Sequence, residues 1–235
     1  MTAVPDRLDA PWLDAALHLL DRQVVDVDGR MVCNVDDLEL TETPAGDLAV
    51  TGLLVGPAAL VPRLSGRLGR WLREMWVALG VQYADRDVPL HLGLDLVESV
   101  GSDVRLRVRR EGLLDRQPEA APGLRHRRMD HLLGLEVRLD GKPAGEVLDV
   151  RVQPRPEEGR FPVRSLVVGR GRPGSLLGYD RGNVDGPWLV SSVVSALHRH
   201  TGELAIEAVD RIDWEAGIVT GHGPLRPLGR RGQEA

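Results

Sequence analysis

The chain has 235 residues, of which 42% are hydrophobic and 28% are charged. This composition excludes a chain that is disordered throughout, and the length fits one large domain or two small ones. The net charge of −5 argues against a general nucleic-acid binder, and a single cysteine, Cys33, excludes an intrachain disulfide and a cysteine-based zinc site.

The N-terminal segment predicts a short helix with Asp9 as its N-cap. Apolar residues recur there at helical spacing, at Trp12, Leu13, Ala16, Leu17 and Leu20. The segment lacks the basic start and apolar run of a signal peptide. The longest uncharged stretch, 48–62, is too short to span a bilayer and contains glycine and proline. We therefore expect a cytoplasmic protein without membrane insertion.

Blocks of the chain repeat at an offset of 112 or 113 residues. VVDVDGRMVCNVDDLEL (Val24–Leu40) aligns with EVRLDGKPAGEVLDVRV (Glu136–Val152), and TGLLVG (Thr51–Gly56) aligns with RSLVVG (Arg164–Gly169). A third block follows in the same order. The pattern predicts two related domains of about 90 residues, because a solenoid needs three or more short repeats.

Each repeat opens with an Asp-Gly pair between alternating apolar residues, at Asp28-Gly29 and Asp140-Gly141. Asp-Gly is favoured in the type I′ turn of a β-hairpin, where both central residues need positive φ. Further apolar strands are expected in both repeats, at 38–41, 48–55 and 104–108 and at 150–152, 163–168 and 218–221. Short strands with tight turns favour a small antiparallel barrel.

A helix is expected between the fourth and fifth strands of each repeat, at 67–80 and at 186–202. The apolar residues of both segments follow helical spacing. Trp71, Trp76 and Trp188 lie on these helices, and we interpret them as packing residues.

The hairpin segments LLDRQVVDVDGRMVCNVDDLEL and LLGLEVRLDGKPAGEVLDVRV resemble the opening of the PRC-barrel family. The GLLVG and SLVVG strands and the last strand fit the later part of that family. The resemblance implies a six-stranded barrel that makes protein or RNA–protein contacts and is not usually an enzyme.

The expected fold class is therefore mainly β with inserted helices, with two small antiparallel PRC-like barrels in tandem related by a pseudo-two-fold. The expected organisation is an N-terminal helical segment (1–18), a first domain (19–110), a basic linker (111–130), a second domain (131–222) and a flexible tail (223–235). Two like barrels in one chain suggest a monomer that forms its own pseudo-dimer, or else a homodimer.

Two arginine-rich stretches are candidate binding sites. Residues 105–128 hold eight arginines against three acidic residues. Arg105, Arg107 and Arg109 would form one outward row on a strand, which could bind a phosphate backbone or an acidic partner. The alternative is an edge strand whose charges prevent aggregation. Arg127 and Arg128 lie at the end of this stretch. The alternative interpretation is that the stretch is a solvated linker without a binding role. Arg170 and Arg172 lie in the glycine-rich segment 169–182, which either cradles an anion or connects two elements.

No catalytic motif is recognisable, and we expect no enzyme activity, cofactor or metal site. Asp36 and Asp37 are interpreted as a solvated face, and Cys33 as a buried structural thiol. We expect an adaptor or regulator that binds a protein partner. Two alternatives remain open: an RNA- or ribosome-associated assembly factor that uses residues 105–128, and a sensor of an anion or small molecule.

Overall fold

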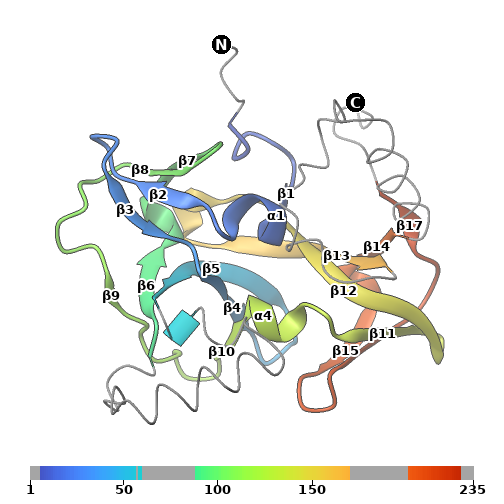
Figure 1. Ribbon diagram of the computed structural model, residues 1–235. Helices are drawn as coiled ribbons and strands as arrows, with labels where there is room; N and C mark the ends of the chain where they lie inside the picture. Colours follow the sequence, from blue (N-terminus) through green and yellow to red (C-terminus); the bar gives the residue numbers. More distant parts are fainter. Residues whose placement is uncertain (1–5, 57, 60–87, 170–200, 229–235) are drawn as a thin grey trace, which may run out of the picture. The chain divides into compact units, whose positions relative to one another are not determined.

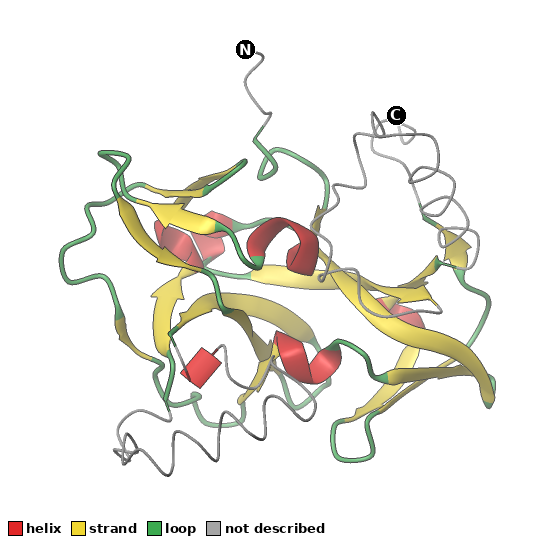
Figure 2. Cartoon of the chain, viewed as in Figure 1, coloured by secondary structure: helices red, strands yellow, loops and turns green. Residues whose placement is uncertain are grey.

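A computed structural model describes residues 6–56, 58–59, 88–169 and 201–228. Figure 2 shows that these residues form mainly strands, with a few short helices. The mainly β class expected from the sequence is therefore confirmed. The helices expected at 67–80 and 186–202, with Trp71, Trp76 and Trp188, lie outside the described residues.

The chain divides into two compact units, each built from segments that are distant in the sequence. Unit 1 takes its described residues from Met1–Leu13, His18–Asp130 and Gln153–Pro162, and unit 2 from Asp14–Leu17, His131–Val152 and Val163–Ala235. Both units thus include residues from the first and the second half of the chain. Two of the passages from one unit to the other lie within short helices, α1 (Ala15–Leu19) and α4 (Met129–Leu132).

The strands of unit 1 belong to two groups (Figure 1). The first group has the order β3-β2-β8-β7, and the second has the order β10-β4-β5-β6-β9. Their bounds are β2 Gln23–Val25, β3 Met31–Asn34, β4 Asp37–Glu42, β5 Leu48–Val55, β6 Leu90–Gly93, β7 Val97–Val100, β8 Val104–Leu106, β9 Asp115–Arg116 and β10 Arg125–Arg128. The 3₁₀ helices of this unit are η2 Leu94–Leu96 and η3 Pro156–Glu158.

Unit 2 has the strand order β13-β12-β11-β16-β15, and β14 pairs with both β13 and β17. The bounds of these elements are β11 Glu136–Leu139, β12 Lys142–Val152, β13 Phe161–Gly169, β14 Gly202–Ala205, η5 Ile206–Ala208, β15 Val209–Asp213, β16 Ile218–Gly221 and β17 Arg226–Pro227. Strand β13 contributes its first two residues to unit 1, and β1 (Leu13–Asp14) contributes its second residue to unit 2.

The same four-strand arrangement occurs in both units. The order β3-β2-β8-β7 in unit 1 corresponds to β12-β11-β16-β15 in unit 2. In each case the middle pair is parallel and the outer pairs are antiparallel. The repeated sequence blocks therefore fold into repeated pairings.

The closed antiparallel barrels expected from the sequence are not what the described strands form. They form two mixed sheets, and neither closes into a barrel. The parallel pairs β2·β8 and β11·β16 join strands that are far apart in the sequence. Local alternation of apolar residues gives no information on the direction of such a pairing, which explains this error.

Buried residues line one face of the four-strand arrangement in unit 1. The register places Cys33, Val24, Val104 and Val100 in one row across the four strands. Cys33 is 9% exposed and the three valines are fully buried. Burial, with a smaller contribution from Asp36, raises the pKa of the Cys33 thiol to about 11. This is the expected environment of a structural thiol.

The N-terminal helix begins later than the sequence suggests. Asp9 lies in a turn, and α1 starts at Ala15. The side chain of Asp149 takes the place of an N-cap, because its carboxylate accepts hydrogen bonds from the backbone N–H groups of Ala16 (2.8 Å) and Leu17 (3.1 Å). A carboxylate from a distant strand can satisfy these unpaired N–H groups as well as a local cap can.

Candidate functional site

Only Arg105 of the predicted arginine row lies on a strand, because β8 ends at Leu106 and Arg107 and Arg109 follow it. Strand β8 is an interior strand that pairs with β2 on one side and with β7 on the other. Val104 and Leu106 are buried, whereas Arg105 and Arg107 are exposed. Strand β8 is thus not an edge that charge must protect. The outward face of this paired strand carries Arg105, and Arg107 is exposed just after the strand ends.

Apolar side chains are exposed beside this row. The register places Met31, Val25, Arg105 and Ser99 side by side across β3, β2, β8 and β7. Met31 is 49% exposed, and Val27 in the turn between β2 and β3 is 46% exposed. We call Val27, Met31, Arg105 and Arg109 the hairpin patch.

A buried carboxylate stabilises the turn that carries the patch. The Asp26 carboxylate accepts hydrogen bonds from the backbone N–H groups of Asp28 (3.0 Å), Arg30 (2.8 Å) and Arg110 (3.3 Å). Burial opposes ionisation of Asp26, but these N–H groups hold its pKa below the ordinary value. The Nε of Arg109 lies 3.4 Å from the Asp28 carboxylate. The patch is therefore presented on a fixed turn.

The two Asp-Gly turns differ. Asp140 and Gly141 have φ of 49° and 76°, as a type I′ turn requires. In the first repeat Gly29 has φ of 76°, and Asp28 does not share the positive φ. The Asp26 side chain organises that longer turn instead.

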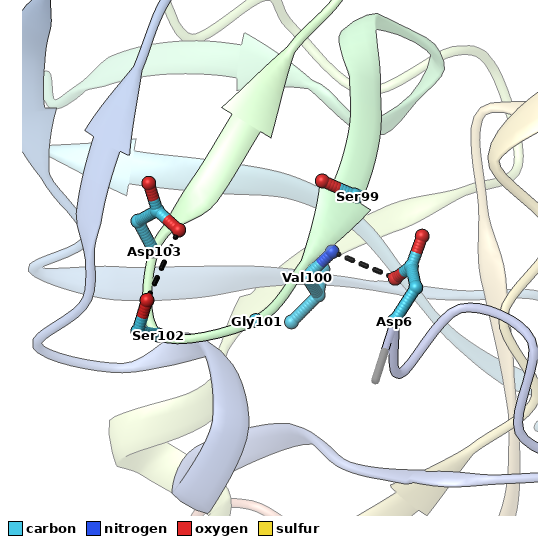
Figure 3. A pocket seen from close by; sticks show the side chains of 6 residues that line it. All are labelled: Asp6, Ser99, Val100, Gly101, Ser102 and Asp103. Carbon is cyan, nitrogen blue, oxygen red and sulfur yellow. Dashed lines mark hydrogen bonds between the residues drawn. The ribbon is translucent and has the colours of Figure 1, made fainter. Parts of the chain in front are cut away.

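A shallow hollow of about 190 Å³ lies at the turn between β7 and β8 (Figure 3). Its lining is Asp6, Ser99, Val100, Gly101, Ser102 and Asp103. The Asp6 carboxylate is already engaged, because it accepts hydrogen bonds from the N–H groups of Val100 and Leu8, both at 3.0 Å. Pockets for small molecules are usually larger and more apolar, so this hollow is a weak candidate.

The chemically densest part of unit 1 is centred on Glu39 of β4, which is 2% exposed. Its carboxylate accepts hydrogen bonds from the Thr51 hydroxyl (2.6 Å) and the Gln117 amide (2.7 Å). His91 Nε2 lies 3.6 Å from one carboxylate oxygen, and His126 Nδ1 lies 3.3 Å from the other. We call these five residues the Glu39 cluster.

The Glu39 cluster favours the ionised carboxylate. Burial alone would raise the pKa of Glu39, but His91, Thr51 and Gln117 outweigh it and lower the pKa to about 2. His91 Nε2 is buried and has no hydrogen-bond partner among the described residues, because 3.6 Å is too long for a hydrogen bond. One buried anion thus holds together strands β4, β5, β6 and β10.

Arg127 and Arg128 pair with acidic residues of unit 1. Their Nε atoms donate hydrogen bonds to Glu42 (3.2 Å) and to Asp37 (2.9 Å) respectively. Segment 111–130, expected as a linker, contains β9 and β10, and β10 pairs with β4. The positive charge of this segment therefore complements the acidic strand β4.

The solvated face expected at Asp36 and Asp37 is wrong for Asp37, which is fully buried. Its Oδ1 accepts hydrogen bonds from the N–H groups of Leu38 (2.8 Å) and Asp130 (3.3 Å). Burial and the nearby Asp130 carboxylate raise the pKa of Asp37 to about 7, against the effects of Leu38 and Arg128.

Unit 2 has its own buried charge at Arg151 of β12, which is 7% exposed. Arg151 donates hydrogen bonds to Asp14 (Nε, 3.0 Å) and to Glu203 (Nη1, 2.6 Å). The Ser165 hydroxyl donates to the other oxygen of Glu203 (2.5 Å). Sequence reasoning missed this cluster and the Glu39 cluster, because both charges alternate with apolar residues as the exposed residues of a half-buried strand do.

Arg170 and Arg172 lie outside the described residues. Within the described part of the chain, no group of three or more His, Cys, Asp or Glu side chains is arranged to hold a metal ion. The helices described here are all too short or too polar to cross a membrane. Comparison of the chain with protein-family models and with curated proteins gives no match.

Proposed function

We propose that the chain is a tandem of two repeats related in sequence to the PRC-barrel family, and that it acts by binding a protein partner rather than by catalysing a reaction. The observation that carries this proposal is the hairpin patch. Methionine and arginine are enriched in protein interfaces, and exposed apolar residues next to cations give a partner both contact area and orientation.

The sheet edge beside the patch adds a second means of contact. Strand β3 pairs with β2 alone among the described strands, so no described strand pairs with its other edge. An open edge next to apolar side chains suits an extended segment of a partner.

Photo-cross-linking in cells tests this proposal. A photoreactive amino acid placed at Met31 should form a defined adduct with another protein, and Val27→Glu should abolish it. The control position is Val88, which is 43% exposed and lies outside the patch. If position 31 gives no adduct beyond those found at position 88, the patch does not bind a protein partner.

The exposed arginines of the patch support RNA binding as a second candidate function. Arg105 and Arg109 would contact phosphates, because their ion pairs with Asp103 (3.7 Å) and Asp28 (3.4 Å) are solvent-exposed. Arg127 and Arg128 are held in less exposed ion pairs with β4. RNA affinity should then fall steeply with salt and drop in Arg105→Glu. Binding that does not depend on salt would exclude this function. The sensor alternative rests on segment 169–182, which is mostly outside the described residues.

A further inference from the structure

Two equivalent buried positions of the repeats carry opposite charges. Glu39 of β4 pairs in register with Gly52, and Arg151 of β12 pairs in register with Ser165. The paired strands β4·β5 and β12·β13 correspond in the two repeats, so Glu39 and Arg151 occupy the same place. Glu39 is 2% exposed and Arg151 is 7% exposed. Because water cannot solvate these charges, neighbouring polar side chains of the same chain must stabilise them.

The side chains that face these two residues also differ in charge. His91 of β6 and Glu203 of β14 lie at equivalent register positions, opposite Leu54 and Val167. His91 faces the anionic Glu39, whereas Glu203 accepts a hydrogen bond from the cationic Arg151. These two pairs of positions thus carry opposite polarity in the two repeats.

Short segments that lead into the repeats complete each cluster. Residues 14–17 lead into the first repeat but belong to unit 2, and residues 125–130 lead into the second repeat but belong to unit 1. We call these two stretches the leading segments. Asp14 of one pairs with Arg151, whereas Arg128 of the other pairs with Asp37 on the acidic strand β4.

A shared contact would allow either leading segment to bind either repeat. Asp149 accepts hydrogen bonds from the N–H groups of Ala16 and Leu17, and the equivalent Asp37 accepts one from the N–H group of Asp130. Both repeats therefore hold the start of a short helix with the same carboxylate. This backbone contact does not distinguish the two segments.

We infer that the reversed charge polarity determines which leading segment each repeat binds. In the opposite assignment, Asp14 would lie against the acidic residues of β4, and Arg128 would lie near Arg151. Burying like charges together is strongly unfavourable, so repulsion excludes the wrong assignment while attraction favours the right one. This inference does not depend on the proposed binding function.

The test uses substitutions in the full chain that give the second repeat the buried charges of the first. Asp14→Arg, Arg151→Glu and Glu203→His copy Arg128, Glu39 and His91, the corresponding residues of unit 1. Asp14→Arg alone should lower the urea midpoint of unfolding, and the triple variant should regain most of that loss. A triple variant no more stable than Asp14→Arg would overturn the inference.

A cross-link then reports where the leading segment 125–130 binds. Glu42 and Arg125 are register partners on β4 and β10, and antiparallel partners lie within disulfide reach. Glu42→Cys and Arg125→Cys are introduced with Cys33→Ala, and the chain is refolded and oxidised. With native polarity the disulfide should form almost completely.

In the triple variant both leading segments carry an arginine and both repeats carry a buried glutamate, so the native and the exchanged assignment should have similar free energies. The cross-linked fraction should then fall toward about half. A recovered urea midpoint together with an unchanged cross-linked fraction would show that polarity does not select the segment.

Discussion

The missing side chain at Gly52 determines where His91 can lie. A Cβ atom built at Gly52 would overlap the imidazole ring of His91. Gly52→Ala should therefore displace the ring from Glu39 and destabilise the protein by about 1–3 kcal/mol, as overpacking does. Urea unfolding at neutral pH measures the loss.

Gly101→Ala is the matched control, because a Cβ at Gly101 meets nothing within 4 Å. It should leave the urea midpoint close to that of the wild type. Equal midpoints for both variants would show that the His91 ring moves at no cost.

The ionised Glu39 should make the protein sensitive to acid. The folded-state pKa is about 2 and the ordinary value is 4.5, so this carboxylate contributes stability above pH 4.5 that is lost as pH falls through about 2. The difference corresponds to about 3 kcal/mol. Glu39→Gln should lower stability at neutral pH and flatten its decline in acid.

Urea unfolding between pH 2 and pH 6 checks this slope, and Glu119→Gln at an exposed position is the control. The slope should change in the Glu39 variant and stay the same in the control. An unchanged slope in Glu39→Gln would mean that the carboxylate is not stabilised by its neighbours.

At the scale of elements, the start of α1 depends on a residue that is distant in the sequence. Asp149→Ala removes the acceptor of the Ala16 and Leu17 N–H groups, and loss of such a cap costs about 1–2 kcal/mol. Asp149→Asn keeps an acceptor and should lose less. Urea unfolding of the two variants measures the difference.

Asp9→Ala is the control, because Asp9 lies in a turn before α1 and does not cap it. Its urea midpoint should match the wild type. A larger loss of stability in Asp9→Ala than in Asp149→Ala would show that Asp9 is the N-cap, as the sequence suggests.

Much of the secondary structure could be predicted because its signals are local. Val104 and Leu106 alternate with exposed arginines, and this alternation gives a strand directly. The two repeats gave corresponding elements because the same pattern occurs twice. The parallel pairs β2·β8 and β11·β16 could not be predicted, because they join strands with no local sequence signal of their partner.

The candidate sites were harder to predict than the strands. The exposed row at Arg105 and Arg107 follows from alternation alone. Arg127 and Arg128 look equally free in the sequence, yet they pair with β4 because β10 joins that sheet. The Glu39 cluster combines residues from five separate segments, and only tertiary structure brings them together.

At the scale of the whole molecule, the uneven charge along the chain is partly balanced within unit 1. The acidic strand β4 meets the basic strand β10, so the charge of segment 105–128 is not all available to a partner. The net charge of −5 thus conceals both internal ion pairs and an exposed cationic face.

Two buried carboxylates on β4 should together set the pH of maximum stability. Asp37 has a raised pKa of about 7 against an ordinary 3.8, because of burial and the Asp130 carboxylate. A raised carboxyl pKa gives stability below pH 3.8 that is lost as pH rises through about 7. Glu39 gives the opposite slope below pH 4.5. Stability should therefore peak near about pH 4, between the two ordinary values, and decline from there toward pH 7.

Urea unfolding of the full chain between pH 3 and pH 8 tests this optimum. Asp37→Asn should remove the decline on the alkaline side and leave the acid side unchanged, whereas Glu39→Gln should do the reverse. The acid-side and alkaline-side slopes have different origins, because the Glu39 carboxylate accepts hydrogen bonds from donors whereas the Asp37 carboxylate lies beside Asp130. A wild-type stability that stays level from pH 5 to pH 8 would show that Asp37 is ionised in the folded protein at little cost.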